Sequence, residues 1–235
     1  MKPVVILRHT PGEGPGYFAT FLHEHGIAQR LICVDQGEPI PEFPEVYSGI
    51  VFMGGPMSVN DDLPWIPRSL ELIRRAVNRD VPVLGHCLGG QLISKALGGI
   101  VTRNPVREIG WGTVSRVENP IAHSWMSDLP AQFDAFHWHG ETFTIPPGAA
   151  HILSSNFCRT QGFALGKHLG LQCHVEMTSS MVEAWCVNGA EEISANPGPS
   201  VQDAQTMKSD LDARVSALNQ VAAKLYRRWI EGLAI

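Results

Sequence analysis

The sequence predicts an α/β fold, a three-layer sandwich with a mainly parallel central sheet. Short apolar runs rich in β-branched residues alternate with stretches of helical periodicity in the first part of the chain, a pattern typical of β-α-β units. A middle stretch, residues 110–172, holds short strands without helical segments between them, which predicts a mixed or antiparallel extension of the sheet. An amphipathic segment near the C-terminal end predicts a helix that packs on the domain.

Four strands are expected first, where apolar runs are bounded by turn residues, at residues 3–7, 31–34, 49–53 and 81–85. Apolar residues at three-to-four spacing predict helices between and after these strands, at residues 17–25, 67–79 and 89–97. Gly26 and Gly98 directly follow the first and the last of these helical segments, as is common at helix ends.

Five further strands are expected in the middle of the chain, at residues 113–117, 135–138, 151–153, 162–165 and 169–173. The segment Asn196-Pro197-Gly198-Pro199-Ser200 then indicates a turn or linker, and helical spacing of apolar residues resumes from Met207 to Trp229. The expected organisation is one domain over residues 1–195, followed by a linker and a packed amphipathic helix over residues 196–235.

Composition excludes several classes of protein. Of the 235 residues, 44% are hydrophobic and 17% charged, which is ordinary for a compact globule. The formal net charge is −5, so no basic surface predicts binding to nucleic acid or to an anionic membrane. No apolar run is long enough for a signal peptide or a membrane span. Five cysteines without a CxxC pair argue against a disulfide framework, and a cytoplasmic location is expected.

The segment from Gly85 to Gln91 has the layout of a nucleophile elbow with cysteine as the nucleophile. It follows a buried strand and opens a helix, and glycines stand two residues before and after Cys87. A sharp strand-to-helix turn needs these glycines because side chains there would collide, and it projects the thiol from the carboxyl end of the sheet. The helix N-terminus favours the thiolate, and backbone N–H groups, beginning with that of Leu88, can stabilise an oxyanion.

A cysteine nucleophile needs a histidine base and a group that orients this base. His174 and Glu176 follow an expected strand and are separated by one residue. In an extended segment such residues project to the same side, so the carboxylate can fix the tautomer of the imidazole. The pair is a weak signal alone, but after an upstream elbow it predicts a catalytic set of Cys87, His174 and Glu176.

The elbow, the Gly54-Gly55-Pro56 turn and the His-x-Glu pair, in this order, resemble the class I glutamine amidotransferases, above all stand-alone relatives of the glutaminase domain of GMP synthase. The resemblance covers about residues 45 to 185, and the fold expected with it is flavodoxin-like. It implies that Cys87 is the nucleophile, His174 the base and Glu176 its orienting acid.

The same resemblance implies further site residues. Gly55 matches the second donor of the oxyanion hole, because its turn follows the third strand and would bring a backbone N–H near the elbow. Gln91 matches a glutamine that contacts substrate. The segment around Trp138, His139 and Gly140 is similar to one whose backbone holds the α-amino and carboxylate ends of the substrate.

Two positions depart from the family pattern. His86 stands where the family usually has an apolar residue, and Val175 replaces the customary proline between the histidine and the glutamate. Loss of proline loosens the turn that aims Glu176 but removes no reacting group. His86 either adds a polar contact behind the nucleophile or fills core space, and the second interpretation is favoured.

His137 and His139 are two residues apart on an expected strand, and two such histidines can share a zinc ion. No third ligand motif and no CxxC pair accompanies them. No metal and no other cofactor is therefore expected.

The expected reaction is hydrolysis of the γ-glutamyl amide of glutamine through a cysteine thioester, which releases glutamate and ammonia. No length remains for the ATP-pyrophosphatase domain of a complete GMP synthase, so a separate synthetase subunit would use the ammonia. Alternatively, the chain is a γ-glutamyl peptidase that acts on γ-glutamyl conjugates. A non-enzymatic regulatory or binding module would lack the nucleophile or the base, and a DJ-1/PfpI-type hydrolase typically has histidine where Leu88 stands.

Overall fold

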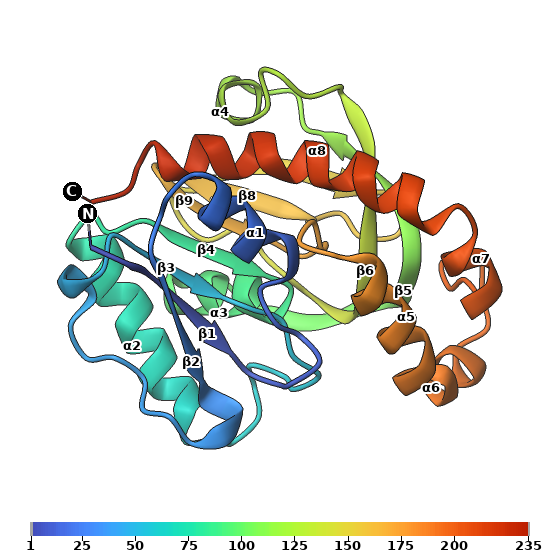
Figure 1. Ribbon diagram of the computed structural model, residues 1–235, viewed down its shortest axis with the longest axis horizontal. Helices are drawn as coiled ribbons and strands as arrows, with labels where there is room; N and C mark the ends of the chain where they lie inside the picture. Colours follow the sequence, from blue (N-terminus) through green and yellow to red (C-terminus); the bar gives the residue numbers. More distant parts are fainter. Residues whose placement is uncertain (1, 235) are drawn as a thin grey trace.

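The computed structural model describes residues 2–234, and across them nine strands form a single sheet in the order β2-β1-β3-β4-β9-β8-β7-β5-β6 (Figure 1). Neighbouring strands are parallel in the first part of this order. These strands are β2 (Gln29–Cys33), β1 (Val4–Arg8), β3 (Gly49–Phe52), β4 (Val83–His86) and β9 (His168–Leu171). Their bounds lie close to the expected ones, because apolar runs interrupted by glycine and proline are local signals.

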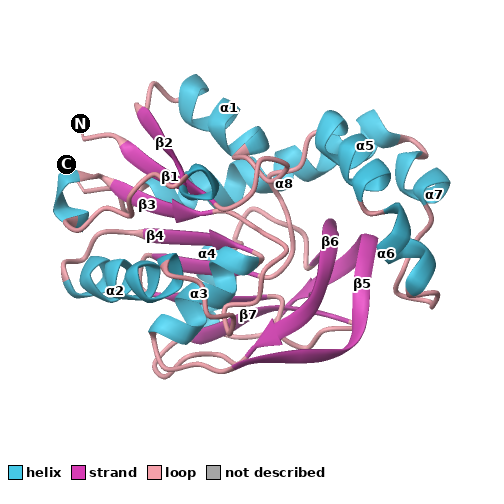
Figure 2. Ribbon diagram, turned by 90° about the horizontal axis from the view of Figure 1, so that it is seen from below, coloured by secondary structure: helices cyan, strands magenta, loops and turns pink. Residues whose placement is uncertain are grey.

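The other half of the sheet is antiparallel. It consists of β8 (Gly162–Leu165), β7 (Ala150–Ser155), β5 (Val101–Arg116) and β6 (Gln132–Phe143). With 16 and 12 residues, β5 and β6 form a long ribbon at one end of the molecule (Figure 2). The expected antiparallel extension is therefore present, but it makes up half of the sheet, so the prediction that the sheet as a whole is mainly parallel is wrong. The strands expected at 113–117 and 135–138 are only parts of β5 and β6, because their mutual pairing extends both strands through polar residues.

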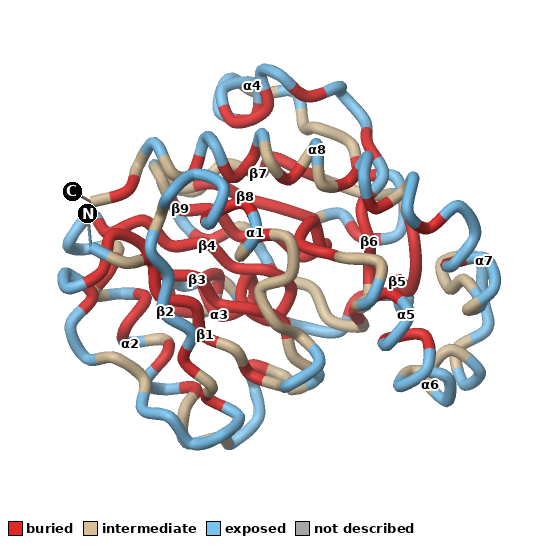
Figure 3. Tube along the Cα trace, viewed as in Figure 1, coloured by how far each residue is buried: buried red, intermediate tan, exposed pale blue. Residues whose placement is uncertain are grey.

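Successive residues of the parallel strands point to opposite faces of the sheet and enter two separate cores. On one face, alternate β1 residues pack with α1 (Gly16–Glu24) and α8 (Leu211–Ile230). On the other face, the remaining β1 residues pack with α2 (Trp65–Asn78) and α3 (Leu88–Ala96). Figure 3 shows the buried strands between partly exposed helices. Helices therefore cover both faces of the parallel half.

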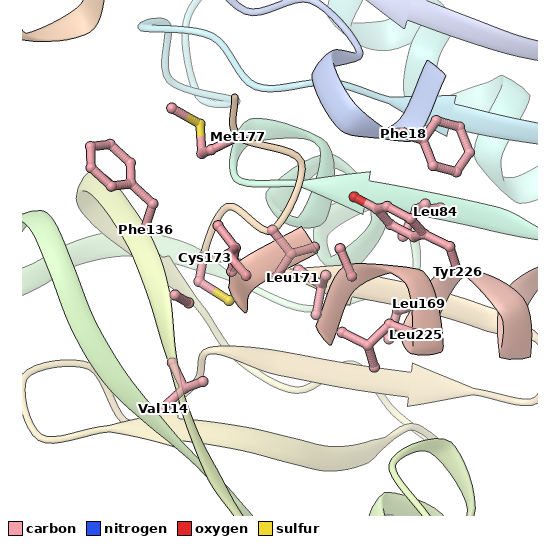
Figure 4. Close-up of a cluster of buried hydrophobic side chains, with 14 of the residues drawn as sticks. Phe18, Leu84, Val114, Phe136, Leu169, Leu171, Cys173, Met177, Leu225 and Tyr226 are labelled. Atoms are coloured by element: carbon pink, nitrogen blue, oxygen red, sulfur yellow. The ribbon is translucent and has the colours of Figure 1, made fainter. Parts of the chain in front are cut away.

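The C-terminal helix begins later than the periodicity predicts. The apolar spacing that starts at Met207 runs through two helices, α7 (Ala204–Lys208) and α8, because the backbone turns at Asp210, where φ is 51°. α8 buries Tyr226 and Trp229 completely, and Figure 4 shows Tyr226 among the side chains of this core. Full burial of a large apolar side chain contributes about 1.5–3 kcal/mol. α8 is therefore an integral part of the hydrophobic core.

The remaining helices are short. They are α4 (Pro120–Trp125) between β5 and β6, α5 (Ser179–Asn188), α6 (Ala190–Ala195) and the 3-10 helices η1 (Val34–Gln36) and η2 (Pro44–Val46). Figure 2 shows α5, α6 and α7 beside the β5–β6 ribbon, at the end toward which the carboxyl ends of β3 and β4 point. Open α/β sheets bind ligands at this edge. Within residues 2–234, no helix has the length and apolar character needed to cross a membrane.

Candidate active site

Cys87 forms a sharp turn between β4 and α3. Its φ is 51°, a left-handed value that is rare for residues other than glycine. Such backbone strain is characteristic of turns at functional sites. The Cys87 N–H donates to the Leu171 carbonyl of β9 at 2.8 Å, which fixes the turn against the neighbouring strand. Cys87 is buried, and it is the residue directly before the first turn of α3. The elbow predicted from the sequence is thus present in the backbone geometry.

His174 and Glu176 form a buried pair beside this turn. His174 Nδ1 lies 2.6 Å from Glu176 Oε1, and both residues are 1% exposed. Burial favours the neutral imidazole, but Glu176 and Cys87 together raise the pKa of His174 well above its ordinary value. Burial also opposes ionisation of Glu176, yet His86 and His174 lower its pKa to about 2. Among residues 2–234, His174 Nε2 has no hydrogen-bond partner, so this nitrogen is free to exchange a proton.

Trp185 of α5 holds the imidazole in place, a contact that the sequence did not reveal. Its ring packs edge-on against His174, with ring centroids 4.9 Å apart and an interplanar angle of 86°. The indole N–H donates to the Gly12 carbonyl at 2.8 Å. Trp185 therefore links the loop after β1 to the His174 segment.

The backbone N–H groups of Gly55 and Leu88, both near Cys87, have no backbone acceptor in the part of the chain that the structure describes. Leu88 is the first residue of α3, where helical N–H groups have no partner within the helix. Gly55 lines the same cleft as Cys87, and a Cβ there would lie 2.8 Å from Leu88 Cδ2. The two residues predicted to supply oxyanion donors therefore lie next to each other, and their N–H groups have no backbone acceptor within residues 2–234.

The four expected substrate contacts, Gln91, Trp138, His139 and Gly140, line one open cleft with Cys87. This cleft has a volume of about 1140 Å³. Gln91 Nε2 donates to Gln172 Oε1 at 3.2 Å, and Gln172 Nε2 lies 3.5 Å from the thiol. The structure thus brings these positions together around Cys87.

His86 does more than fill core space, and the favoured interpretation of this residue was wrong. The side chain is completely buried, with Nε2 3.0 Å from the Tyr226 hydroxyl oxygen and 3.8 Å from Glu176 Oε2. Burial lowers the pKa of His86, although Glu176 opposes this shift. His86 therefore presents a polar group from β4, and Tyr226 one from α8, behind the carboxylate that orients His174.

The variant His86→Leu is expected to lower kcat/KM about tenfold, because a hydrogen-bonding group behind Glu176 is lost. Since His86 lowers the pKa of Glu176, its removal is also expected to shift the acid limb of the pH–rate profile to higher pH. Tyr226→Phe removes only the hydroxyl that contacts His86, and it should leave the effect of His86 on the pKa of Glu176 in place. A variant with a lower melting temperature but an unchanged pH profile would show that His86 acts through packing alone.

A third potential metal ligand accompanies His137 and His139, which the sequence analysis missed. Glu108 of β5 pairs directly with His139 of β6, and donor atoms of the three buried side chains lie within 4.8 Å of one another. These atoms already bond to one another and to Gln161: Glu108 Oε2 is 3.0 Å from His139 Nε2 and 2.6 Å from Gln161 Nε2. The cluster could hold a metal ion only if the Gln161 amide moved. As it stands, it supports the cleft-lining segment of β6.

Glu13 also lies at the site, although no sequence motif predicted it. It lies in the glycine-rich loop after β1, and its carboxylate packs against Gly54, close to His174. Its position follows a simple rule, because loops after parallel strands gather at one edge of the sheet. That rule could have indicated Glu13, but it applies equally to other acidic residues in loops of the sequence.

Comparisons with known proteins agree with this geometry. The family described as glutamine amidotransferase class-I matches residues 28–187. The glutamine amidotransferase-like protein YfeJ of Salmonella typhimurium is 27% identical over 225 residues, 93% of this chain and 92% of that protein. A GMP synthase of Aeropyrum pernix is 29% identical over 182 residues, 75% of this chain but 33% of that protein, so the chain spans about a third of this relative.

A solved structure extends the agreement to the whole chain. The crystal structure of a glutamine amidotransferase from Methylobacillus flagellatus is similar with a TM-score of 0.96 and 45% identity, and the match covers 100% of this chain and 96% of that one. The family match alone spans more than half of the sequence. The chain belongs to the class I glutamine amidotransferase family.

Proposed function

We propose that this chain hydrolyses γ-glutamyl amides through a thioester on Cys87, with His174 as general acid and base. The observation that carries the proposal is the 2.6 Å contact of His174 Nδ1 with Glu176, which leaves Nε2 free beside the thiol. Because the pKa of His174 is raised, the imidazolium can stand next to a thiolate before the reaction starts.

In the proposed cycle, the Cys87 sulfur attacks the γ-carbonyl carbon, and the carbonyl oxygen becomes an oxyanion. The free N–H groups of Gly55 and Leu88 donate to this oxygen. The C–N bond then breaks while His174 gives its Nε2 proton to the departing nitrogen. A water molecule, deprotonated by His174, attacks the thioester, and glutamate leaves as the sulfur is regenerated.

Two substrate classes fit this chemistry. With glutamine, the leaving group is ammonia, and the likeness to part of a GMP synthase supports a separate synthetase subunit that would use it. With a γ-glutamyl peptide or conjugate, the leaving group is a substituted amine. The cleft of about 1140 Å³ exceeds the roughly 300–1,000 Å³ of ordinary small-molecule pockets, which favours the larger substrates in an isolated chain.

The test is release of glutamate by the purified chain from glutamine and from a panel of γ-glutamyl peptides, with Cys87→Ala as the blank. We expect Cys87-dependent release, faster from the peptides than from glutamine. Preference for glutamine would indicate an ammonia-supplying subunit instead. Release that Cys87→Ala does not reduce would exclude the thioester mechanism, and no release from any substrate would indicate a subunit that needs its synthetase partner for activity.

A further inference from the structure

Glu13 is held rigidly beside the general acid. The Glu13 N–H donates to the Thr10 carbonyl at 3.2 Å, and the preceding residue, Gly12, accepts from the Trp185 indole at 2.8 Å. On the far side of the loop, the Tyr17 N–H donates to the backbone carbonyl of Glu176 at 2.8 Å. The loop is therefore fastened at both ends to the segments that surround His174.

The carboxylate of Glu13 packs very closely against the site. A Cβ placed on Gly54 would lie only 2.0 Å from Glu13 Oε2 and 3.2 Å from His174 Cε1. Position 54 must therefore be glycine for Glu13 to occupy this place. The carboxylate thus borders the imidazole that would protonate the leaving group.

Glu13 differs from the other acidic residues of the cleft. Three further carboxylates line it, and each already accepts a hydrogen bond: Asp61 from the Ser58 N–H at 2.9 Å, Glu141 from the Ser58 hydroxyl at 3.0 Å and Glu192 from the Trp138 indole at 2.9 Å. Within residues 2–234, no hydrogen bond or ion pair satisfies Glu13. Burial raises the pKa of Glu13 to about 7, with His174 opposing the shift and Glu176 adding to it.

Glu13 is half-buried, and a carboxylate that is partly shielded from water and lacks a partner is stabilised when a cation binds to it. The direction from which a cation arrives follows from the proposed mechanism. His174 gives its proton to the departing nitrogen, so the substituent on that nitrogen extends along the part of the cleft that borders His174. Glu13 lies there, whereas the expected contacts to the glutamyl end lie on β6 and α3.

We propose that Glu13 is a cation subsite for the leaving group, which makes γ-glutamyl amides of diamines or polyamines preferred substrates of this chain. The inference rests on the proposed γ-glutamyl hydrolase function and specifies its substrate class. A positively charged leaving amine supplies the partner that the Glu13 carboxylate lacks, and its binding keeps this carboxylate ionised at neutral pH.

The test compares two amides of equal size. One is the γ-glutamyl monoamide of putrescine, which carries a terminal ammonium. The other is the γ-glutamyl amide of n-pentylamine, in which a methyl group replaces that ammonium. We expect wild-type kcat/KM to favour the cationic amide by about tenfold, the effect of about 1.4 kcal/mol, and Glu13→Gln to reduce this ratio to about one.

Glu141→Gln is the matched control, because it neutralises a cleft carboxylate that already has a partner, and it should retain the preference. Equal rates for both amides in the wild-type chain, or a preference that survives in Glu13→Gln, would overturn the inference while leaving the hydrolase function intact. If neither amide is cleaved, the hydrolase function fails with these substrates. Calorimetric binding of the two amides to Cys87→Ala then tests the subsite without turnover. Tighter binding of the cationic amide that is lost in the Cys87→Ala, Glu13→Gln double variant supports the subsite. Equal binding of the two amides refutes it.

Discussion

Cys87→Ala is expected to lower the rate of γ-glutamyl hydrolysis by about 10⁴-fold or more while leaving the fold intact. Loss of a nucleophile removes the covalent route entirely, and the oxyanion donors alone support only residual catalysis. The fold should persist because the hydrogen bonds of the thiol are long, 3.5 Å to Gln172 Nε2 and 3.8 Å to the Trp138 carbonyl. Alanine also keeps the Cβ, so the turn at φ 51° is no more strained than with cysteine.

The measurement is glutamate release under saturating substrate, together with thermal unfolding of both proteins. Cys33→Ala is the matched control, since that thiol lies at the end of β2 and does not line the cleft. We expect the control to retain activity. A folded Cys87→Ala protein with near wild-type turnover would disprove the assignment of the nucleophile.

The second large effect is expected from Gly89→Ala, a change of one methyl group in the elbow. A Cβ at Gly89 would lie 2.0 Å from the Phe52 carbonyl oxygen and 2.7 Å from its carbon. These are backbone atoms of β3, so no side chain can turn away, and α3 must shift relative to the sheet. We expect a loss of about 3 kcal/mol in the free energy of unfolding, or failure to fold. Because α3 carries the Leu88 N–H, activity should fall with it.

Urea unfolding and glutamate release measure both consequences. Gly198→Ala is the control, because nothing lies within 4 Å of a Cβ at that position and its φ is not left-handed. It should leave stability unchanged within about 0.5 kcal/mol, or raise it slightly by restricting the unfolded chain. A Gly89→Ala protein as stable as this control would show that the elbow tolerates a side chain, contrary to the close contact with β3.

Local signals were sufficient for the parallel half of the fold. The strand at 49–53 was expected from its apolar run and the glycines that follow, and β3 spans Gly49–Phe52. The helix expected at 89–97 is α3, Leu88–Ala96. Such segments are recognisable because burial on both faces demands continuous apolar residues, and glycines interrupt them.

Local signals did not predict elements that depend on long-range pairing. β5 begins at Val101, well before the expected strand at 113–117, because β6 supplies hydrogen bonds to a polar stretch with no strand signal of its own. The helix expected from Met207 is divided near Asp210, where a left-handed residue redirects the chain. For β5, a long-range contact therefore outweighed local propensity.

The sequence by itself determined the two local motifs on which the proposed chemistry rests, because the elbow around Cys87 and the His174–Glu176 pair are each built from residues close together in the chain. Only the tertiary structure decided what surrounds them. Glu13 reaches His174 from the loop after β1, and Tyr226 reaches His86 from α8. The physical reason is that sequence spacing fixes the relative directions of nearby side chains, whereas contacts between distant segments depend on strand order and on the packing of helices against the sheet.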